Sequence, residues 1–309
     1  MPHNAIDKEK WDTAIRRSFN GNLYAYSWYL DTVHPQWEAL VEDDYLRVMP
    51  LTGNRKWGVH YLFQPFFTQQ LGVFSTEILN SHVLNLFFAA IPDKFRFVQI
   101  NLNVHNKPHP EDYRLVPNKN YLLDLIGRYP ALASRYATNT KRNLKKALRS
   151  DLVLQQGMQP QHLIDLFRQN KGRDIGHWHN AHYLRLQRLM YRAIYKGAGV
   201  AFGVYDRRNE LCAGAFFLKD HRHLVFLFSA TSAEGRKNGA MTFLLDAVIR
   251  SHAETARVLD FEGSNHPDLA RFYRGFGAQA ITYYRLEMNR LPFPVNRMVY
   301  YLKQKKREH

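Results

Sequence analysis

Cysteine and long hydrophobic runs are the two features that this sequence most clearly lacks. Cys212 is the only cysteine among 309 residues, so no disulfide can form within one chain, and a reducing compartment is favoured. No run of about 18 apolar residues occurs, which argues against a membrane-spanning helix. Residues 1–12 are polar and charged, so we expect no secretory signal. Together these absences predict a cytoplasmic protein.

Acidic residues are scarce only in the second half. The chain has a net charge of +16; residues 1–130 hold 13 Lys/Arg and 13 Asp/Glu, whereas residues 131–309 hold 30 and 14. An electropositive half predicts a polyanionic partner such as tRNA, a diphosphate-bearing substrate or an anionic membrane surface. A solvated basic surface that serves only solubility would explain the same excess.

The second half has a clear order of predicted elements. Apolar residues recur at helical spacing in some segments, and β-rich runs bounded by turn residues occur in others. The predicted helices cover residues 158–171, 179–196, 241–254 and 266–276, and the predicted strands cover residues 199–206, 211–220, 223–232, 257–263 and 281–288. The first three strands form an antiparallel meander. A helix connects the third strand to the fourth, so these two can be parallel neighbours.

The first half shows a weaker version of the same order. It has predicted helices over residues 22–33 and 76–90, and predicted strands over residues 37–43, 45–51, 57–67, 94–103, 113–116 and 121–125. This repetition predicts an α+β protein with a duplicated architecture. We place the N-terminal domain at residues 1–133 and the C-terminal domain at residues 134–309.

A basic helix is predicted between the halves, over residues 138–150. Arg142, Lys145, Lys146 and Arg149 share one of its faces, and residues 135–150 contain no acid. Most of these charges suit a solvated linker. Arg142 and Lys145 are nevertheless candidates to contact a phosphate-bearing ligand, because ligand sites concentrate in clefts between domains.

Two stretches resemble a known family. LDFEGS…LARFYRGFGA (259–278) resembles a strand end followed by a helix in the Fem-type peptidyltransferases, and YAYSWYLDTV (24–33) is similar to a helix near their start. The element order of the second half resembles the GNAT acyltransferase fold. The chain as a whole therefore resembles tandem GNAT-fold acyltransferases of the Fem type (FemAB/FemX-like) and related acetyltransferases.

This resemblance implies a fold and an activity. Each domain would be a GNAT-like mixed, largely antiparallel sheet flanked by helices. The activity would be direct transfer of an acyl or aminoacyl group to an amine in the interdomain cleft, with no covalent enzyme intermediate and no metal. The donor would be acetyl-CoA or another acyl-CoA, or alternatively aminoacyl-tRNA. The acceptor would be a peptidoglycan precursor or another cell-envelope intermediate.

The segment FSATSAEGRKNGA (228–240) is the main candidate site. Main-chain N–H groups of a glycine loop and a helix N-terminus can bind a pyrophosphate, although Met241 replaces the small residue usual at the end of the GNAT motif. Ser229 is a candidate catalytic hydroxyl. Where the Fem-type helix has a lysine this chain has Tyr273, so that role passes to Arg274. The predicted donor-binding residues are Thr231, Gly235, Arg236, Lys237, Asn238, Gly239, Ala240 and Arg274.

Asp260 and Glu262 stand at the end of the predicted strand 257–263. Two residues apart on a strand, their side chains would share one face. Glu262 is the candidate general base for deprotonating the amine. Equally, both acids can serve only as caps or ion-pair partners. Cys212 lies mid-strand, where a small core residue is expected rather than a nucleophile.

The histidine-rich stretch HWHNAH (177–182) has no cysteine or acid to complete a familiar metal site. We expect Arg173 and His177, in the polar loop before the second helix, to contact the acceptor. Residues 295–309 are predicted to form a basic terminal helix that either packs or touches an anionic membrane. The alternative to an enzyme is a non-catalytic RNA-binding module, which needs the basic surface but not the Glu262 chemistry.

Overall fold

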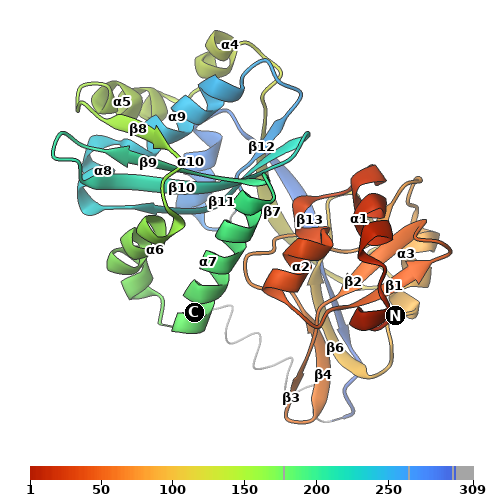
Figure 1. The fold of residues 1–309 in the computed structure, drawn as a ribbon. Helices are drawn as coiled ribbons and strands as arrows, with labels where there is room; N and C mark the ends of the chain where they lie inside the picture. The colour runs from red at the N-terminus through yellow and green to blue at the C-terminus, as the bar shows by residue number, and fades with distance from the viewer. Residues whose placement is uncertain (177, 264, 294–295, 297–309) are drawn as a thin grey trace. The chain divides into compact units, whose positions relative to one another are not determined.

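The computed structural model describes residues 1–176, 178–263, 265–293 and 296 (Figure 1). It has two compact units: unit 1 comprises Met1–Asn118 and Tyr283–His309, and unit 2 comprises Lys119–Thr282. The predicted boundary after residue 133 gave the last strand to the second half. In the structure that strand belongs mainly to unit 1, because Leu286 lies fully buried in the core of unit 1.

Unit 1 contains two sheets. The first has the order β1-β2-β5, and the second includes β3, β4, β6 and β13 as successive neighbours. The strands are β1 Glu38–Glu42, β2 Arg47–Leu51, β3 Gly53–Lys56, β4 Val59–Phe63, β5 Phe74–Ser75, β6 Phe95–Asn101 and β13 Gln279–Asn289; the helices are η1 His3–Ala5, α1 Lys8–Arg17, η2 Leu23–Ala25, α2 Ser27–Val33 and α3 Ser81–Ala89. The sequence missed α1. Apolar side chains of α3 pack with those of the second sheet to form the core.

The strands of unit 2 are hydrogen-bonded in the order β7-β12-β11-β10-β9-β8. Its strands are β7 Arg114–Asp124, β8 Val153–Gln156, β9 Gly199–Tyr205, β10 Leu211–Lys219, β11 His223–Thr231 and β12 Val258–Asp260. Its helices are α4 Tyr129–Ser134, α5 Thr138–Ala147, α6 Pro160–Gln169, η3 Lys171–Asp174, α7 Asn180–Tyr195, α8 Ala233–Asn238, α9 Ala240–His252 and α10 Pro267–Arg274. The short predicted strands 113–116 and 121–125 are parts of β7.

The predicted pairing of the central strands of unit 2 is confirmed. Strands β9, β10 and β11 form an antiparallel meander, and β11 pairs in parallel with β12 after the α9 crossover. Figure 1 shows α6 and α7 on one face of these strands and α5 and α9 on the other. The predicted linker helix is therefore α5, packed against α9 within unit 2.

No helix within the described ranges is long and apolar enough to cross a membrane. Apart from Asn296, the predicted terminal helix lies outside the described residues.

Candidate functional site

The site begins where two parallel strands stop pairing. Strand β11 pairs with β12 only from His223 to Val225, because β12 ends at Asp260. β11 continues to Thr231, and in the described part of the chain no strand covers that side of its last six residues. Helix α10 lies across the opening instead, so the sheet edge borders a pocket.

The pocket has a volume of about 370 Å³ and lies entirely within unit 2. Strand β11, the junction of α8 with α9, helix α5 and helix α10 each contribute to its wall. The lining residues are Asn143, Phe226, Ser229, Thr231, Gly235, Arg236, Gly239, Met241, Thr242, Leu269, Phe272 and Tyr273.

A β-bulge determines which β11 side chains enter the pocket. Phe216 of β10 pairs with Phe228, but the next residue pairs with Phe226, so Leu227 is the extra residue. A bulge shifts the side-chain alternation by one position. Phe226 therefore lies on the pocket side together with Ser229 and Thr231.

The turn between α8 and α9 requires glycine at position 239. Gly239 has φ +79°, and a Cβ there would lie 2.8 Å from the carbonyl oxygen of Asn143. Both the left-handed backbone and the close approach of α5 exclude a side chain. Gly239 thus allows α9 to begin immediately beside α5 and the pocket.

The N–H groups that the sequence offered for anion binding are engaged within the protein. Gly235 N–H donates to the Ser232 hydroxyl at 2.9 Å, and Ala240 N–H donates to Asn238 Oδ1 at 3.1 Å. Gly239 N–H donates to the Gly235 carbonyl. The main-chain N–H groups that remain available to a ligand are those of Met241 and Thr242, one and two residues after Ala240. Both line the pocket and lie in the first turn of α9, where a helix has no acceptors of its own.

The pocket includes five of the residues predicted for catalysis and donor binding, namely Ser229, Thr231, Gly235, Arg236 and Gly239. Arg236 is held at the pocket by a hydrogen bond to the Thr231 carbonyl at 3.0 Å. The Ser232 hydroxyl, in the same segment, caps α8.

The other predicted donor-binding residues lie elsewhere. Lys237 is exposed and lies 3.7 Å from Glu234. Asn238 is buried and donates to Cys212 Sγ at 3.6 Å, while Ala240 is fully buried. Arg274 is exposed and donates to the Ala270 carbonyl at 3.3 Å. None of these four side chains lines the pocket: Asn238 and Ala240 are buried in the structure, and Lys237 and Arg274 lie on the surface.

The predicted acceptor-binding residues do not line the pocket either. Arg142 and Lys145 are exposed on α5, and Arg142 donates to Asn139 Oδ1 at 2.7 Å. Asn143, between them, is the residue of α5 that reaches the pocket. Arg173 is exposed in η3, and His177 lies outside the described residues.

The prediction that Asp260 and Glu262 share a strand face is wrong. β12 ends at Asp260, and Glu262 has φ +54°, so strand alternation does not extend to it. Asp260 accepts a hydrogen bond from Glu262 N–H at 2.7 Å. Burial raises the pKa of the Asp260 carboxyl, and the hydrogen bond from Glu262 N–H opposes this rise. Asp260 therefore orders the chain after β12.

Tyr273 is the residue that the sequence reasoning undervalued. It lines the pocket, is only 8% exposed, and its ring stacks on Phe261 at 4.9 Å. Burial, and to a smaller extent the nearby charge of Glu262, raises the pKa of Tyr273 well above its usual value. Its hydroxyl therefore remains a protonated donor. The signal was the helical spacing of Leu269, Phe272 and Tyr273, which places all three on one face of α10.

Cys212 is a buried core residue, as predicted. Burial raises the pKa of its thiol, so the reactive thiolate is disfavoured. Among the described residues no group of His, Cys, Asp or Glu is arranged to hold a metal. Of the histidine-rich stretch, His182 caps α7, accepting from His179 N–H at 3.0 Å.

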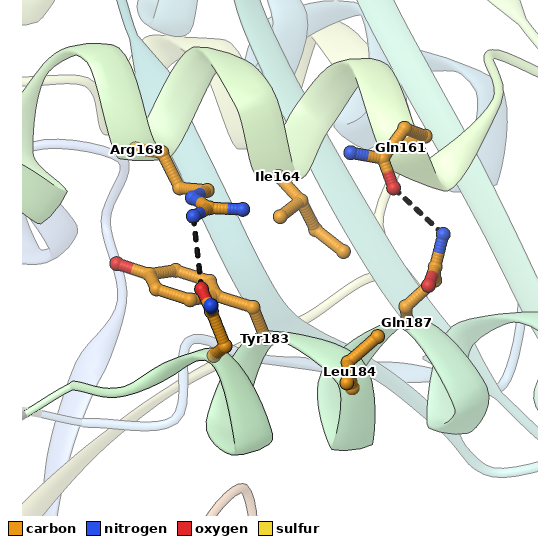
Figure 2. A pocket seen from close by; sticks show the side chains of 7 residues that line it. Gln161, Ile164, Arg168, Tyr183, Leu184 and Gln187 are labelled. Atoms are coloured by element: carbon orange, nitrogen blue, oxygen red, sulfur yellow. Dashed lines mark hydrogen bonds between the residues drawn. The ribbon is translucent and has the colours of Figure 1, made fainter.

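A second pocket, of about 250 Å³, lies between α6 and α7 (Figure 2). Arg168 lies 4.8 Å over the ring of Tyr183 and donates to Asn180 Oδ1 at 3.0 Å. Gln187 donates to Gln161 at 2.6 Å and closes the other end. No motif in the sequence indicated this pocket, because its residues come from two helices whose relative placement is decided only by packing.

Comparison with known proteins identifies the fold. No family model matches the chain, and no curated protein matches it. The structure of FemX is similar, with a TM-score of 0.63, 12% identity, and coverage of 96% of this chain and 98% of that one. The structure of L-PGS from Bacillus licheniformis is similar too, with a TM-score of 0.57 and 11% identity, and the match covers 98% of this chain and 97% of that one.

A tandem GNAT protein from the clavulanic acid biosynthesis pathway is also similar, with a TM-score of 0.55 at 12% identity, covering 94% of this chain and 98% of that one. The chain has a Fem-like tandem GNAT fold. The predicted α+β class and GNAT-type architecture are thus confirmed. In unit 2 the pocket occupies the divergence of the two parallel strands of this fold.

Proposed function

We propose that unit 2 catalyses direct transfer of an acyl or aminoacyl group from a donor in the β11–α10 pocket to an amine. One observation carries the proposal: an uncovered strand edge and the first turn of a helix border the same pocket. The fold is that of FemX and of a tandem GNAT protein whose structure is described as being without AcCoA.

The pocket offers two kinds of donor-binding group. Met241 and Thr242 present main-chain N–H groups at the positive end of the α9 dipole, and Arg236 adds a cation beside them. The main-chain groups of β11 beyond Val225 can pair with an extended amide-bearing arm, as a sheet edge does with a peptide. An acyl-CoA combines a diphosphate with such an arm. Aminoacyl-tRNA is the alternative donor.

The chemistry requires an amine to attack an activated carbonyl. A C–N bond forms, the bond to the donor sulfur or oxygen breaks, the amine loses a proton and the leaving group gains one. Tyr273 is a protonated donor in the pocket wall, so we assign it to the leaving group. We propose that the Ser229 hydroxyl donates a hydrogen bond to the carbonyl oxygen of the donor. We propose that Glu262, which lies close enough to raise the pKa of Tyr273, accepts the proton that the amine loses.

Following the resemblance to the Fem-type enzymes, we propose that the acceptor is an amine of a cell-envelope intermediate such as a peptidoglycan precursor. The β11–α10 pocket accounts for the donor alone.

Calorimetric titration with acetyl-CoA and with charged tRNA tests the donor. We expect acetyl-CoA to bind, and we expect Arg236→Ala to weaken binding about tenfold, the loss of roughly one charge-assisted hydrogen bond. Arg208→Ala is the matched control, because Arg208 is exposed in the β9–β10 turn, away from the pocket lining.

Other outcomes decide between the alternatives. Tight binding of charged tRNA alone would replace the acyl-CoA donor. Salt-dependent binding of uncharged RNA that Arg236→Ala and Glu262→Gln leave unchanged, with no transfer from either donor, would contradict the enzyme and favour an RNA-binding module.

A further inference from the structure

The β3–β4 hairpin of unit 1 has a tryptophan at its tip. Lys56 pairs with Val59, so Trp57 and Gly58 form the whole two-residue loop. Their φ angles are +49° and +79°, as a type I′ turn requires. Such turns favour Asn-Gly, and a bulky residue at positive φ is sterically unfavourable. The turn alone does not explain a tryptophan here.

Trp57 does not contribute to the core. It is 91% exposed, whereas Trp11 and Trp37, also in unit 1, are 0% exposed. Lys56 Nζ lies 4.6 Å from its ring centroid, and Arg55 precedes it; both cations are exposed. The sequence from Gly53 to Phe63 contains no acid. Figure 1 shows the hairpin extending from the body of unit 1.

Strand register brings further groups to the same end of the sheet. β4 runs parallel to β6 with His60 opposite Phe95, and β13 runs antiparallel to β6 with Asn289 opposite Phe97. The starts of β4 and β6 therefore lie beside the ends of β3 and β13. Arg96 is exposed at this end, and Phe293, in the turn after β13, is 74% exposed.

The acids near this end are already paired. Asp93 accepts from Arg290 at 3.3 Å, and Glu38 accepts from Lys94 at 2.6 Å. In the described ranges Arg55, Lys56 and Arg96 have no acidic partner. This end of unit 1, which we term the hairpin edge (Arg55, Lys56, Trp57, Arg96 and Phe293), thus combines two exposed aromatics with three unopposed cations.

We propose that the hairpin edge docks on an anionic lipid bilayer. Trp57 and Phe293 enter the headgroup region, where aromatic rings are favoured because one part is apolar and the other is wet. Arg55, Lys56 and Arg96 bind lipid phosphates from the surface. The steric cost of Trp57 in the turn is then offset by its membrane contact.

A nucleic acid fits these groups less well. Single-stranded RNA binds along a basic groove with successive aromatic platforms for its bases. The hairpin edge instead has Trp57 at the tip of a hairpin, with Lys56 against its ring, and Phe293 on a separate segment. The proposal is also independent of the proposed acyl transfer, because every residue of the hairpin edge belongs to unit 1 and none lines the β11–α10 pocket.

Flotation of the full chain with lipid vesicles tests the proposal. We expect it to bind vesicles of equimolar phosphatidylglycerol and phosphatidylcholine much more strongly than vesicles of phosphatidylcholine alone. Trp57→Asn should lower the partition coefficient at least about tenfold, and the double change Arg55→Ala with Lys56→Ala by about 30-fold, as expected for two surface cations. Ile78→Asn is the matched control: it removes an apolar residue of unit 1 that is 87% exposed and outside the hairpin edge.

The Trp57→Asn variant separates function from folding. Asparagine tolerates positive φ better than tryptophan does, so the midpoint of thermal unfolding should not fall. Equal partition of the parent chain and Trp57→Asn into the anionic vesicles would overturn the proposal. So would equal binding to both vesicle types, or binding of single-stranded RNA that depends on Trp57 while no vesicle is bound.

Discussion

At the scale of single residues, Tyr273 shows how packing changes the role of a side chain. The ring is buried and stacked on Phe261 in the pocket wall, and the hydroxyl keeps its proton because its pKa is raised. Helical spacing predicts that Tyr273 shares a face of α10 with Leu269 and Phe272, but it does not show that this face borders a pocket. That depends on β12 ending at Asp260.

We expect Tyr273→Phe to reduce kcat for acyl transfer by about 100-fold or more, because a general acid contributes on that order. Donor affinity and thermal stability should change little, since the stacked ring is retained. Tyr121→Phe is the control: Tyr121 packs 6.0 Å from Tyr273 but does not line the pocket. An unchanged rate in Tyr273→Phe would exclude the assigned role. Because the pKa of Tyr273 is raised, its hydroxyl stays protonated, and we expect deprotonation of Tyr273 to lower the transfer rate only above about pH 10.

At the scale of elements, α8 is one of the helices that the sequence did not predict. The segment Ala233–Asn238 is too short for apolar periodicity and reads as a polar loop. In the structure Ser232 caps it, and Gly235 packs it against β10 so closely that a Cβ would lie 2.0 Å from the Cys212 carbonyl oxygen. The glycine predicted to bind a phosphate instead allows helix and strand to touch.

This contact predicts the effect of Gly235→Ala. We expect the added methyl to push α8 off β10, to lower the free energy of unfolding by about 1–3 kcal/mol, and to weaken donor binding by displacing Arg236. Denaturant unfolding and donor titration measure both effects. Gly176→Ala is the control, because a Cβ there meets nothing within 4 Å. Equal stability of the two variants would show that α8 is not held by this contact.

At the scale of the whole molecule, β13 connects the end of unit 2 back to unit 1. Its later residues pair with β6, and Leu286 is 0% exposed in the core of unit 1. The sequence could not show this return, because an alternating strand pattern does not specify which sheet the strand joins.

Truncation tests this organisation. A chain ending at Thr282 should lose protease resistance in residues 1–118, while residues 119–282 remain resistant, because every residue removed belongs to unit 1. Limited proteolysis with mass spectrometry identifies the fragments. A chain ending at Phe293 keeps β13 and serves as the control. If residues 134–282 became the sensitive part instead, the boundary predicted from the sequence would be the better description.

The sequence by itself determined the order of most helices and strands, the parallel pairing of β11 with β12, and the concentration of positive charge in the second half. These follow from periodicity, turn residues and composition, which are local properties. The tertiary structure alone decided that Arg236 lines the pocket while Lys237 does not, that Met241 and Thr242 supply the open N–H groups, and that β13 belongs with unit 1. Each of these depends on which elements pack together, and a single element's pattern does not specify its neighbours.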